Sequence, residues 1–151
     1  MKHKVKPVKA KKSSPKKSVP AAAARRPSEL VSFYQMKLEA EWGPYDLKKA
    51  LDDGPERLVV LDTRKPEDYA EEHIPLSVNI PMEELESRLN ELPKDKAVVP
   101  YCWTIVCHLA TRAALLLAKK GYTVHELAGG IGTWKEYGLP VTSKAQEPAL
   151  R

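Results

Sequence analysis

The order of apolar and polar positions predicts alternating short strands and helices from about residue 45 onward. Short apolar runs bounded by turn residues are typical of strands that are buried on both faces of a parallel sheet. Such runs occupy 57–62, 77–80, 97–101 and 122–127. Helical patterns occupy 45–51, 66–70, 83–92, 107–120 and 131–137. This alternation predicts an α/β fold in three layers, with a central parallel sheet covered by helices on both faces.

Three details of the pattern lead to sharper expectations. The segment 107–120 is apolar almost all round, so we expect its helix to be largely buried. The segment 83–92 is expected to form an amphipathic helix that ends at Pro93. Pro100 removes one backbone N–H from a strand that we expect to be central, which predicts a local irregularity.

Charge separates the N-terminus from the rest of the chain. Residues 1–26 carry eight Lys and two Arg and no Asp or Glu, a net charge of +10, whereas the remainder has fifteen basic and twenty acidic residues, a net charge of −5. A low-complexity basic segment is expected to be a disordered tail. It would contact nucleic acid or another polyanion without sequence preference, or act only as a solubilising tail or leader.

The length of 151 residues predicts one domain. We assign 27–44 to an N-terminal arm or short helix, 45–142 to the domain and 143–151 to a C-terminal tail. The two cysteines do not make a disulfide framework of the kind found in small secreted proteins, which favours a reducing, cytoplasmic setting. No apolar run approaches the roughly 18 residues of a membrane span.

Cys102 is the leading candidate for chemistry. It follows a predicted strand and precedes a predicted helix, the place where ligands bind in parallel sheets. Consecutive backbone N–H groups and the helix dipole favour a thiolate there, and the thiolate is the nucleophilic form. The alternative is a small hydrophobic residue buried at the end of a strand.

Several short motifs, in this order, resemble the rhodanese family. They are Val-Leu-Asp-Thr-Arg at 60–64, Glu-His-Ile-Pro at 72–75, Asn-Ile-Pro at 79–81, Tyr-Cys at 101–102, Gly-Gly-Ile-Gly-Thr-Trp at 129–134 and Gly-Leu-Pro-Val at 138–141. The resemblance implies a sulfurtransferase without a cofactor. Its cysteine, matched here by Cys102, carries sulfane sulfur as a persulfide from thiosulfate or a persulfide donor to a thiol or cyanide.

The resemblance also assigns roles around Cys102. The loop residues that would surround the sulfur or bind the substrate are Trp103, Thr104, Ile105, Val106, Cys107 and His108. Asp62 and Arg64 match a pair that orders the site from beneath, and a purely structural ion pair is the favoured alternative. His73 matches a position whose role is architectural.

This loop departs from the family pattern at two positions. Ile105 stands where family loops commonly have glycine, so the amide cradle is expected to be shaped differently. Cys107 stands where they have an arginine, which argues against thiosulfate and in favour of persulfide donors. His108 would replace some of the missing charge or cap the loop, and Arg112 would be the nearest permanent cation. The missing arginine also excludes a phosphatase of this fold.

Cys107 has three interpretations. It is a small residue in the first turn of the helix, or a resolving thiol that closes a disulfide with Cys102, or a metal ligand with Cys102 and His108. The metal site lacks an evident fourth donor, and we expect no metal.

Three functions therefore remain. The first is the sulfurtransferase that uses Cys102. The second is a non-catalytic interaction module of rhodanese type, tethered by its basic tail. The third is a thiol redox sensor that uses Cys102 and Cys107.

Overall fold

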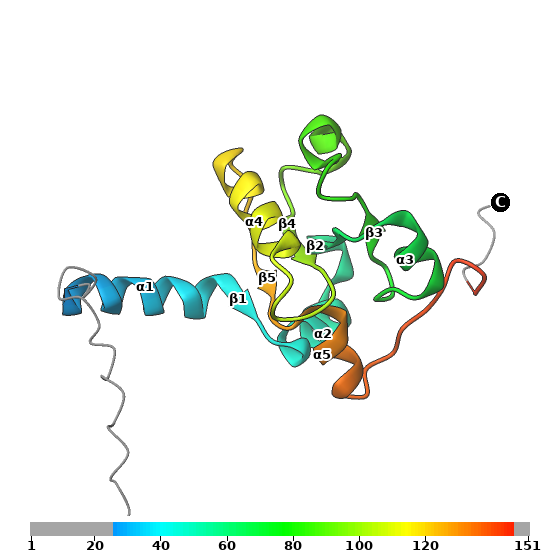
Figure 1. Cartoon of the computed structure of the whole chain (residues 1–151), viewed down its shortest axis with the longest axis horizontal. Coiled ribbons are helices and arrows are strands. Elements are labelled where there is room, and N and C mark those ends of the chain that lie inside the picture. The colour runs from blue at the N-terminus through cyan, green and yellow to red at the C-terminus, as the bar shows by residue number, and fades with distance from the viewer. Residues whose placement is uncertain (1–25, 147–151) are drawn as a thin grey trace, which may run out of the picture.

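The structure is a computed structural model that describes residues 26–146, and its strands form a parallel sheet (Figure 1). Three strands pair in the order β3 (Val78–Asn79), β2 (Leu58–Asp62) and β4 (Ala97–Tyr101). A second parallel pair joins β1 (Glu41–Trp42) to β5 (Glu126–Leu127). A parallel bridge between Val98 and Val124 links the two groups, so the strand order is β3-β2-β4-β5-β1.

Pro100 explains why β4 and β5 meet only through that bridge. Val98 exchanges two hydrogen bonds with the segment before β5. The Val98 amide donates to the Thr123 carbonyl oxygen, and the His125 amide donates to the Val98 carbonyl oxygen. The next residue of β4 that would face this neighbour is Pro100, which has no N–H to donate. The expected irregularity of a central strand is therefore a shortened ladder.

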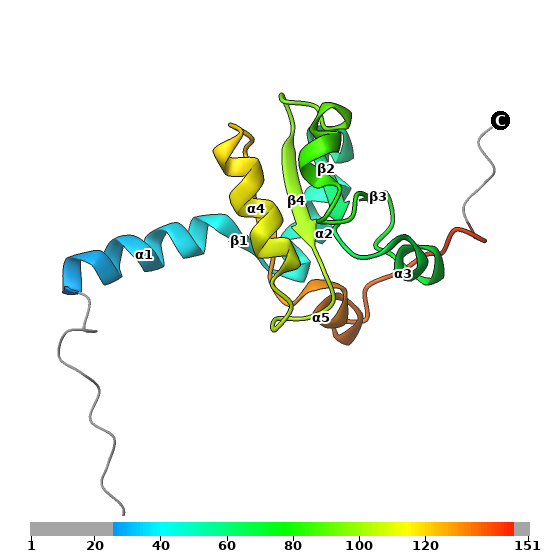
Figure 2. The ribbon, with the colours of Figure 1, turned by 45° about the horizontal axis from the view of Figure 1, so that its top comes forward.

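Helices cover both faces of the sheet, as Figure 2 shows with α4 and α2 on opposite sides of β4. On one face, α2 (Pro44–Asp53) and α5 (Gly130–Glu136) supply Leu47, Ile131 and Trp134 to a core. On the other, α4 (Leu109–Lys119) and the 3₁₀ segment η3 (Leu85–Glu91) pack against a second core. The side chains of β2 and β4 alternate between the two cores. The predicted three-layer α/β fold is confirmed.

Two predicted details of the helices are wrong. The segment 83–92 forms 3₁₀ turns with a kink at Arg88, and Ser87 Oγ donates a hydrogen bond of 2.8 Å to the Glu84 carbonyl oxygen, which competes with regular helix bonding. The helix α4 is buried on one face only, through Ala110, Ala113 and Leu117. Its outer face is largely exposed, and Leu115 on that face is 57% exposed.

The N-terminal helix α1 (Pro27–Ala40) extends away from the sheet and has no buried residue (Figure 1). It is attached at its C-terminal end, where His125 Nδ1 lies 3.0 Å from the Glu39 carbonyl oxygen. The predicted disordered tail lies outside the described residues, except for Arg26. Within residues 26–146, no helix has both the length and the apolar character needed to cross a bilayer.

The remaining short elements are η2 (Pro55–Arg57) and α3 (Pro66–Glu71). The C-terminal segment is held against the residues that follow α3. His73 and Thr142 exchange two backbone hydrogen bonds of 2.8 and 2.9 Å, and the Lys144 amide donates one of 3.2 Å to the Ala70 carbonyl oxygen. The chain therefore packs against the domain as far as Lys144.

Candidate active site

Cys102 lies directly after β4, and the Gly129-Gly130 turn holds its backbone in place. The amide of Ile131 donates a hydrogen bond of 2.9 Å to the Cys102 carbonyl oxygen. The amide of Gly132 donates a hydrogen bond of 2.9 Å to the Trp103 carbonyl oxygen. Gly130 has a φ of +59°, and a β-carbon there would lie 2.3 Å from the Cys102 carbonyl oxygen. Only glycine permits this approach. The start of α5 therefore sets the position of the cysteine.

The Cys102 thiol is almost completely buried, with 2% of the residue exposed. Its Sγ lies 3.0 Å from the Cys107 carbonyl oxygen and 3.9 Å from that of Thr104, so it donates to oxygen acceptors. Burial, followed by the interaction with the Cys107 side chain, raises the pKa of Cys102 to about 11. Main-chain hydrogen bonds from Ala110 and Thr104 act in the opposite direction but are weaker.

Burial therefore disfavours the thiolate form of Cys102 that the sequence position was expected to favour. The loop brings carbonyl oxygens as well as amides to the sulfur, and burial outweighs the amides.

Cys107 is the more acidic of the two thiols. It is partly exposed and precedes α4, which begins at Leu109, so it does not lie in the first helical turn as one interpretation required. Burial alone would raise the pKa of Cys107, but hydrogen bonds from the Cys102 side chain and from the main chain of Leu109 and Trp103 outweigh burial and lower it. Of the two coupled thiols, Cys107 therefore loses its proton before Cys102 does.

Both cysteines line a pocket of about 290 Å³. This volume is near the lower end of the range of about 300 to 1,000 Å³ that is usual for small-molecule sites. Cys102 lines the pocket together with four of the loop residues predicted to bind substrate, namely Thr104, Ile105, Cys107 and His108. Trp103 and Val106 do not line it.

Part of the pocket wall was not predicted. It comes from Lys37 and Glu41, where α1 meets β1, and from Thr111 and Glu126. The parallel pairing of Glu41 with Glu126 brings these segments together. Lys37 and Glu41 are far from Cys102 in the sequence, and only the short pairing of β1 with β5 brings them near it. A local sequence motif therefore could not have identified them.

The charges around the pocket are largely paired. Lys37 forms an ion pair with Glu41, and Thr111 Oγ1 donates a hydrogen bond of 2.8 Å to Glu126 Oε1. His108 is the residue that precedes α4, and its side chain makes no capping hydrogen bond. Arg112 is exposed and does not line the pocket, whereas the cation Lys37 does.

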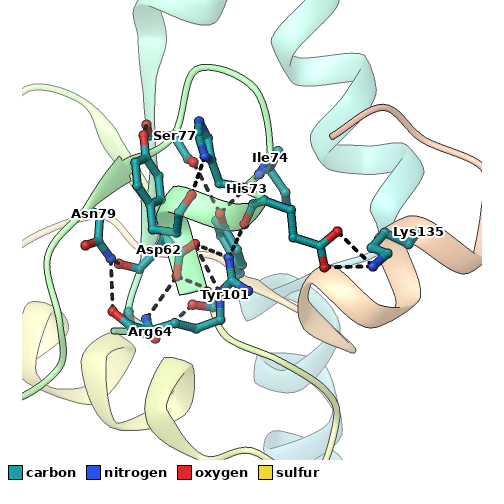
Figure 3. Close-up of polar contacts among 11 residues, drawn as sticks. Asp62, Arg64, His73, Ile74, Ser77, Asn79, Tyr101 and Lys135 are labelled. Carbon is teal, nitrogen blue, oxygen red and sulfur yellow. Dashed lines mark hydrogen bonds and ion pairs between the residues drawn. The ribbon is translucent and has the colours of Figure 1, made fainter. Parts of the chain in front are cut away.

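Asp62 and Arg64 form an ion pair of 2.7 Å in which both side chains are fully buried (Figure 3). The Arg64 side chain also donates a hydrogen bond of 2.7 Å to the Glu72 carbonyl oxygen. Asn79 Nδ2 in turn donates a hydrogen bond of 3.0 Å to the Arg64 carbonyl oxygen. The Trp103 ring lies 4.4 Å from the Arg64 guanidinium carbon. The pair therefore supports the loop through Trp103 and has no side chain in the pocket.

His73 is fully buried beside the same network. Its Nδ1 lies 2.7 Å from the Tyr69 carbonyl oxygen, and the two rings stack with centroids 3.8 Å apart. Together with its backbone bonds to Thr142, this packing gives His73 a structural part, and His73 does not line the pocket that contains the thiols. Across residues 26–146, no group of three or more His, Cys, Asp and Glu side chains is arranged to hold a metal ion.

Comparison with known families decides the classification. The family model of the rhodanese-like domain matches residues 43–137, a span that includes both cysteines, the buried ion pair and the Gly129-Gly130 turn. The chain belongs to the rhodanese family. The resemblance drawn from the short motifs is thereby confirmed.

Proteins similar to this chain include a sulfurtransferase and a transcriptional regulator. This rhodanese-like chain is 35% identical over 89 residues to a sulfurtransferase of Allochromatium vinosum, a match covering 58% of this chain and 81% of that protein. It is 38% identical over 88 residues to the HTH-type transcriptional regulator Rv0324 of Mycobacterium tuberculosis, a match covering 58% of this chain but only 39% of that protein. The crystal structure of the BH2092 protein from Bacillus halodurans superposes with a TM-score of 0.70 at 33% identity, over 83% of this chain and 94% of that one.

Proposed function

We propose that the protein is a sulfurtransferase in which Cys102 accepts sulfane sulfur from a persulfide donor and passes it to a thiol. The observation that carries this proposal is the placement of Cys102. It follows the central strand, opens on a pocket of about 290 Å³ and lies beside a more acidic thiol. The similarity to a sulfurtransferase of Allochromatium vinosum supports the same class of reaction.

The protonation of the pair suggests how Cys102 becomes a nucleophile despite its raised pKa. As Cys102 Sγ attacks the outer sulfur of a donor R–S–SH, its proton passes to the Cys107 thiolate. The S–S bond of the donor breaks, and the leaving thiolate RS⁻ takes the proton from Cys107. The products are a Cys102 persulfide, R–SH and a restored Cys107 thiolate, so Cys107 acts as the general base.

The charges of the pocket favour a persulfide over thiosulfate. Thiosulfate is a dianion, and the cation Lys37 is already paired with Glu41 while Glu126 adds another carboxylate. No arginine of the described chain lines this pocket. A persulfide with a small or neutral reacting end avoids the repulsion that a dianion meets there.

The direct test is a transfer assay with two donors. Glutathione persulfide and thiosulfate would each be offered with cyanide or a thiol as the acceptor, using the parent protein, Cys102→Ser and Cys107→Ser. We expect transfer from the persulfide by the parent, little from thiosulfate, and none with Cys102→Ser. Equal activity of Cys102→Ser and the parent would refute the proposal.

A non-catalytic interaction module is the second candidate. The burial of Cys102 and its raised pKa favour it, because both slow attack on a donor. One relative, the regulator Rv0324, carries its similar region within a longer protein. This candidate predicts salt-sensitive binding to a polyanion that disappears when residues 1–26 are removed, and binding that survives the truncation would count against it. For either function we propose a cytoplasmic protein, because both cysteines are free thiols.

A further inference from the structure

We propose that Cys107 is a second catalytic thiol, which resolves the Cys102 persulfide by releasing its outer sulfur as hydrosulfide and leaving a Cys102–Cys107 disulfide. The inference rests on the proposed function, since Cys102 must first carry sulfur. It adds a distinct activity, the reduction of persulfides at the expense of protein thiols, to simple transfer from donor to acceptor.

The fold of the loop carries this inference. The Cys107 amide donates a hydrogen bond of 3.0 Å to the Thr104 carbonyl oxygen, and this turn brings Cys107 back toward the start of the loop. Cys102 Sγ consequently lies 3.0 Å from the Cys107 carbonyl oxygen, and the two side chains interact directly. Both line the same pocket. A nucleophile held this close reacts within the molecule, with a large advantage over a thiol in solution.

The state of Cys107 suits the role of an attacking thiol. Hydrogen bonds from its surroundings lower its pKa, so it is present as a thiolate more readily than an ordinary cysteine. It returns to that state when the first transfer ends. Cys107 is also more exposed than Cys102, so an external reductant reaches it more easily.

The loop between the two sulfurs has room to adjust. Ile105 and Val106 are 80% and 79% exposed, so little packing opposes a movement of the loop. Disulfide closure requires the two α-carbons to come within roughly 7 Å. Neither Ile105 nor Val106 belongs to either core, so a movement of this short loop toward closure disturbs neither one.

Resolution exchanges one S–S bond for another. The Cys107 thiolate attacks Cys102 Sγ, the inner sulfur of the persulfide, and a new S–S bond forms between the two cysteines. The bond from Sγ to the outer sulfur breaks, and the outer sulfur leaves with the electron pair as HS⁻. The sulfane sulfur is reduced and the two cysteines are oxidised. A small-molecule dithiol or a dithiol protein then reduces the disulfide and is itself oxidised.

The test is a single turnover without acceptor or reductant. The full-length, reduced protein is mixed with one equivalent of glutathione persulfide under anaerobic conditions, and hydrosulfide, intact mass and the 97–112 peptide are followed over time. The parent is compared with Cys107→Ser and Cys107→Ala, two replacements of different polarity. Parent protein without donor is the control for adventitious oxidation.

We expect the parent to release about one equivalent of hydrosulfide as the disulfide forms, and its Cys102 persulfide to decay roughly tenfold faster or more than in either variant. A persulfide on Cys102 that decays equally in all three proteins would overturn this inference while leaving the proposed function intact. Sulfur found on Cys107 without release of hydrosulfide would overturn it as well. Failure to load Cys102 in all three proteins, with no hydrosulfide released by the parent, would overturn both proposals.

Discussion

A β-carbon at position 130 would lie 2.3 Å from the carbonyl oxygen of Cys102. The start of α5 therefore touches the backbone of Cys102 directly, and the amide of Ile131 completes the contact. This contact couples the stability of the fold to the position of the thiol.

Replacing Gly130 with alanine tests that coupling. Gly130→Ala adds the strain of an unfavourable φ, roughly 1 kcal/mol, and a clash with backbone that cannot move aside cheaply. Gly121→Ala is a matched control, because Gly121 has a φ of +81° but a β-carbon added there would meet no atom within 4 Å. We expect Gly130→Ala to lose roughly 2 kcal/mol more than Gly121→Ala in urea unfolding, and to load sulfur poorly. Equal losses would show that the close approach is unimportant.

The buried ion pair gives a second prediction. Asp62→Asn leaves the Arg64 guanidinium without its anionic partner in a fully buried site, which is expected to cost about 3–5 kcal/mol. Asp52→Asn is the control, since Asp52 pairs with Lys48 at the surface and its loss should cost less than about 0.5 kcal/mol. Chemical denaturation of the two variants measures both values. A small loss for Asp62→Asn would mean that the network supporting Trp103 does not depend on charge.

The order of thiol reactivity gives a third prediction. Because the pKa of Cys107 is lowered and that of Cys102 is raised to about 11, iodoacetamide at neutral pH should modify Cys107 first. Trypsin releases both cysteines in the 97–112 peptide, so fragmentation of that peptide must locate the label. In urea the two sites should react at similar rates. Faster labelling of Cys102 in the native protein would reverse the assignment of the thiolate.

The interaction between the thiols gives a fourth prediction. The Cys107 side chain raises the pKa of Cys102, both through a hydrogen bond and through its negative charge, although burial is the larger cause. Cys107→Ser removes that charge, so the pKa of Cys102 should fall below about 11 while staying above that of a free thiol. A titration of thiolate absorbance in the variant measures it. An unchanged pKa would mean that burial alone sets the acidity of Cys102.

Much of the fold was predictable because it depends on local patterns. The strands at 58–62 and 97–101 are apolar, β-rich runs, and their alternation with helices leaves few arrangements open. The burial of α4 was overestimated, because composition does not reveal whether a second layer covers the outer face. The kinked 3₁₀ segment was missed for a similar reason, since a side-chain hydrogen bond at Ser87 changes the helix type without changing the apolar spacing.

The site was only partly predictable. The sequence placed Cys102 at the end of a central strand, but its acidity depends on which main-chain groups face the sulfur after the loop has folded. The contribution of Lys37 and Glu41 depends on the pairing of β1 with β5, which joins distant parts of the chain. The hypothesis of a redox sensor based on the two cysteines stays a prediction.

Whether Cys102 carries sulfane sulfur decides the proposed function, and peptide-resolved mass spectrometry answers this with the fewest assumptions. The protein would be treated with glutathione persulfide until loading is complete, alkylated at once and digested, and the 97–112 peptide would be fragmented. We predict one added sulfur on Cys102 in Cys107→Ser, which loads more slowly without its general base but cannot resolve the persulfide, and none in Cys102→Ser. Folded protein that gains no sulfur at Cys102 under these conditions would contradict the proposed function.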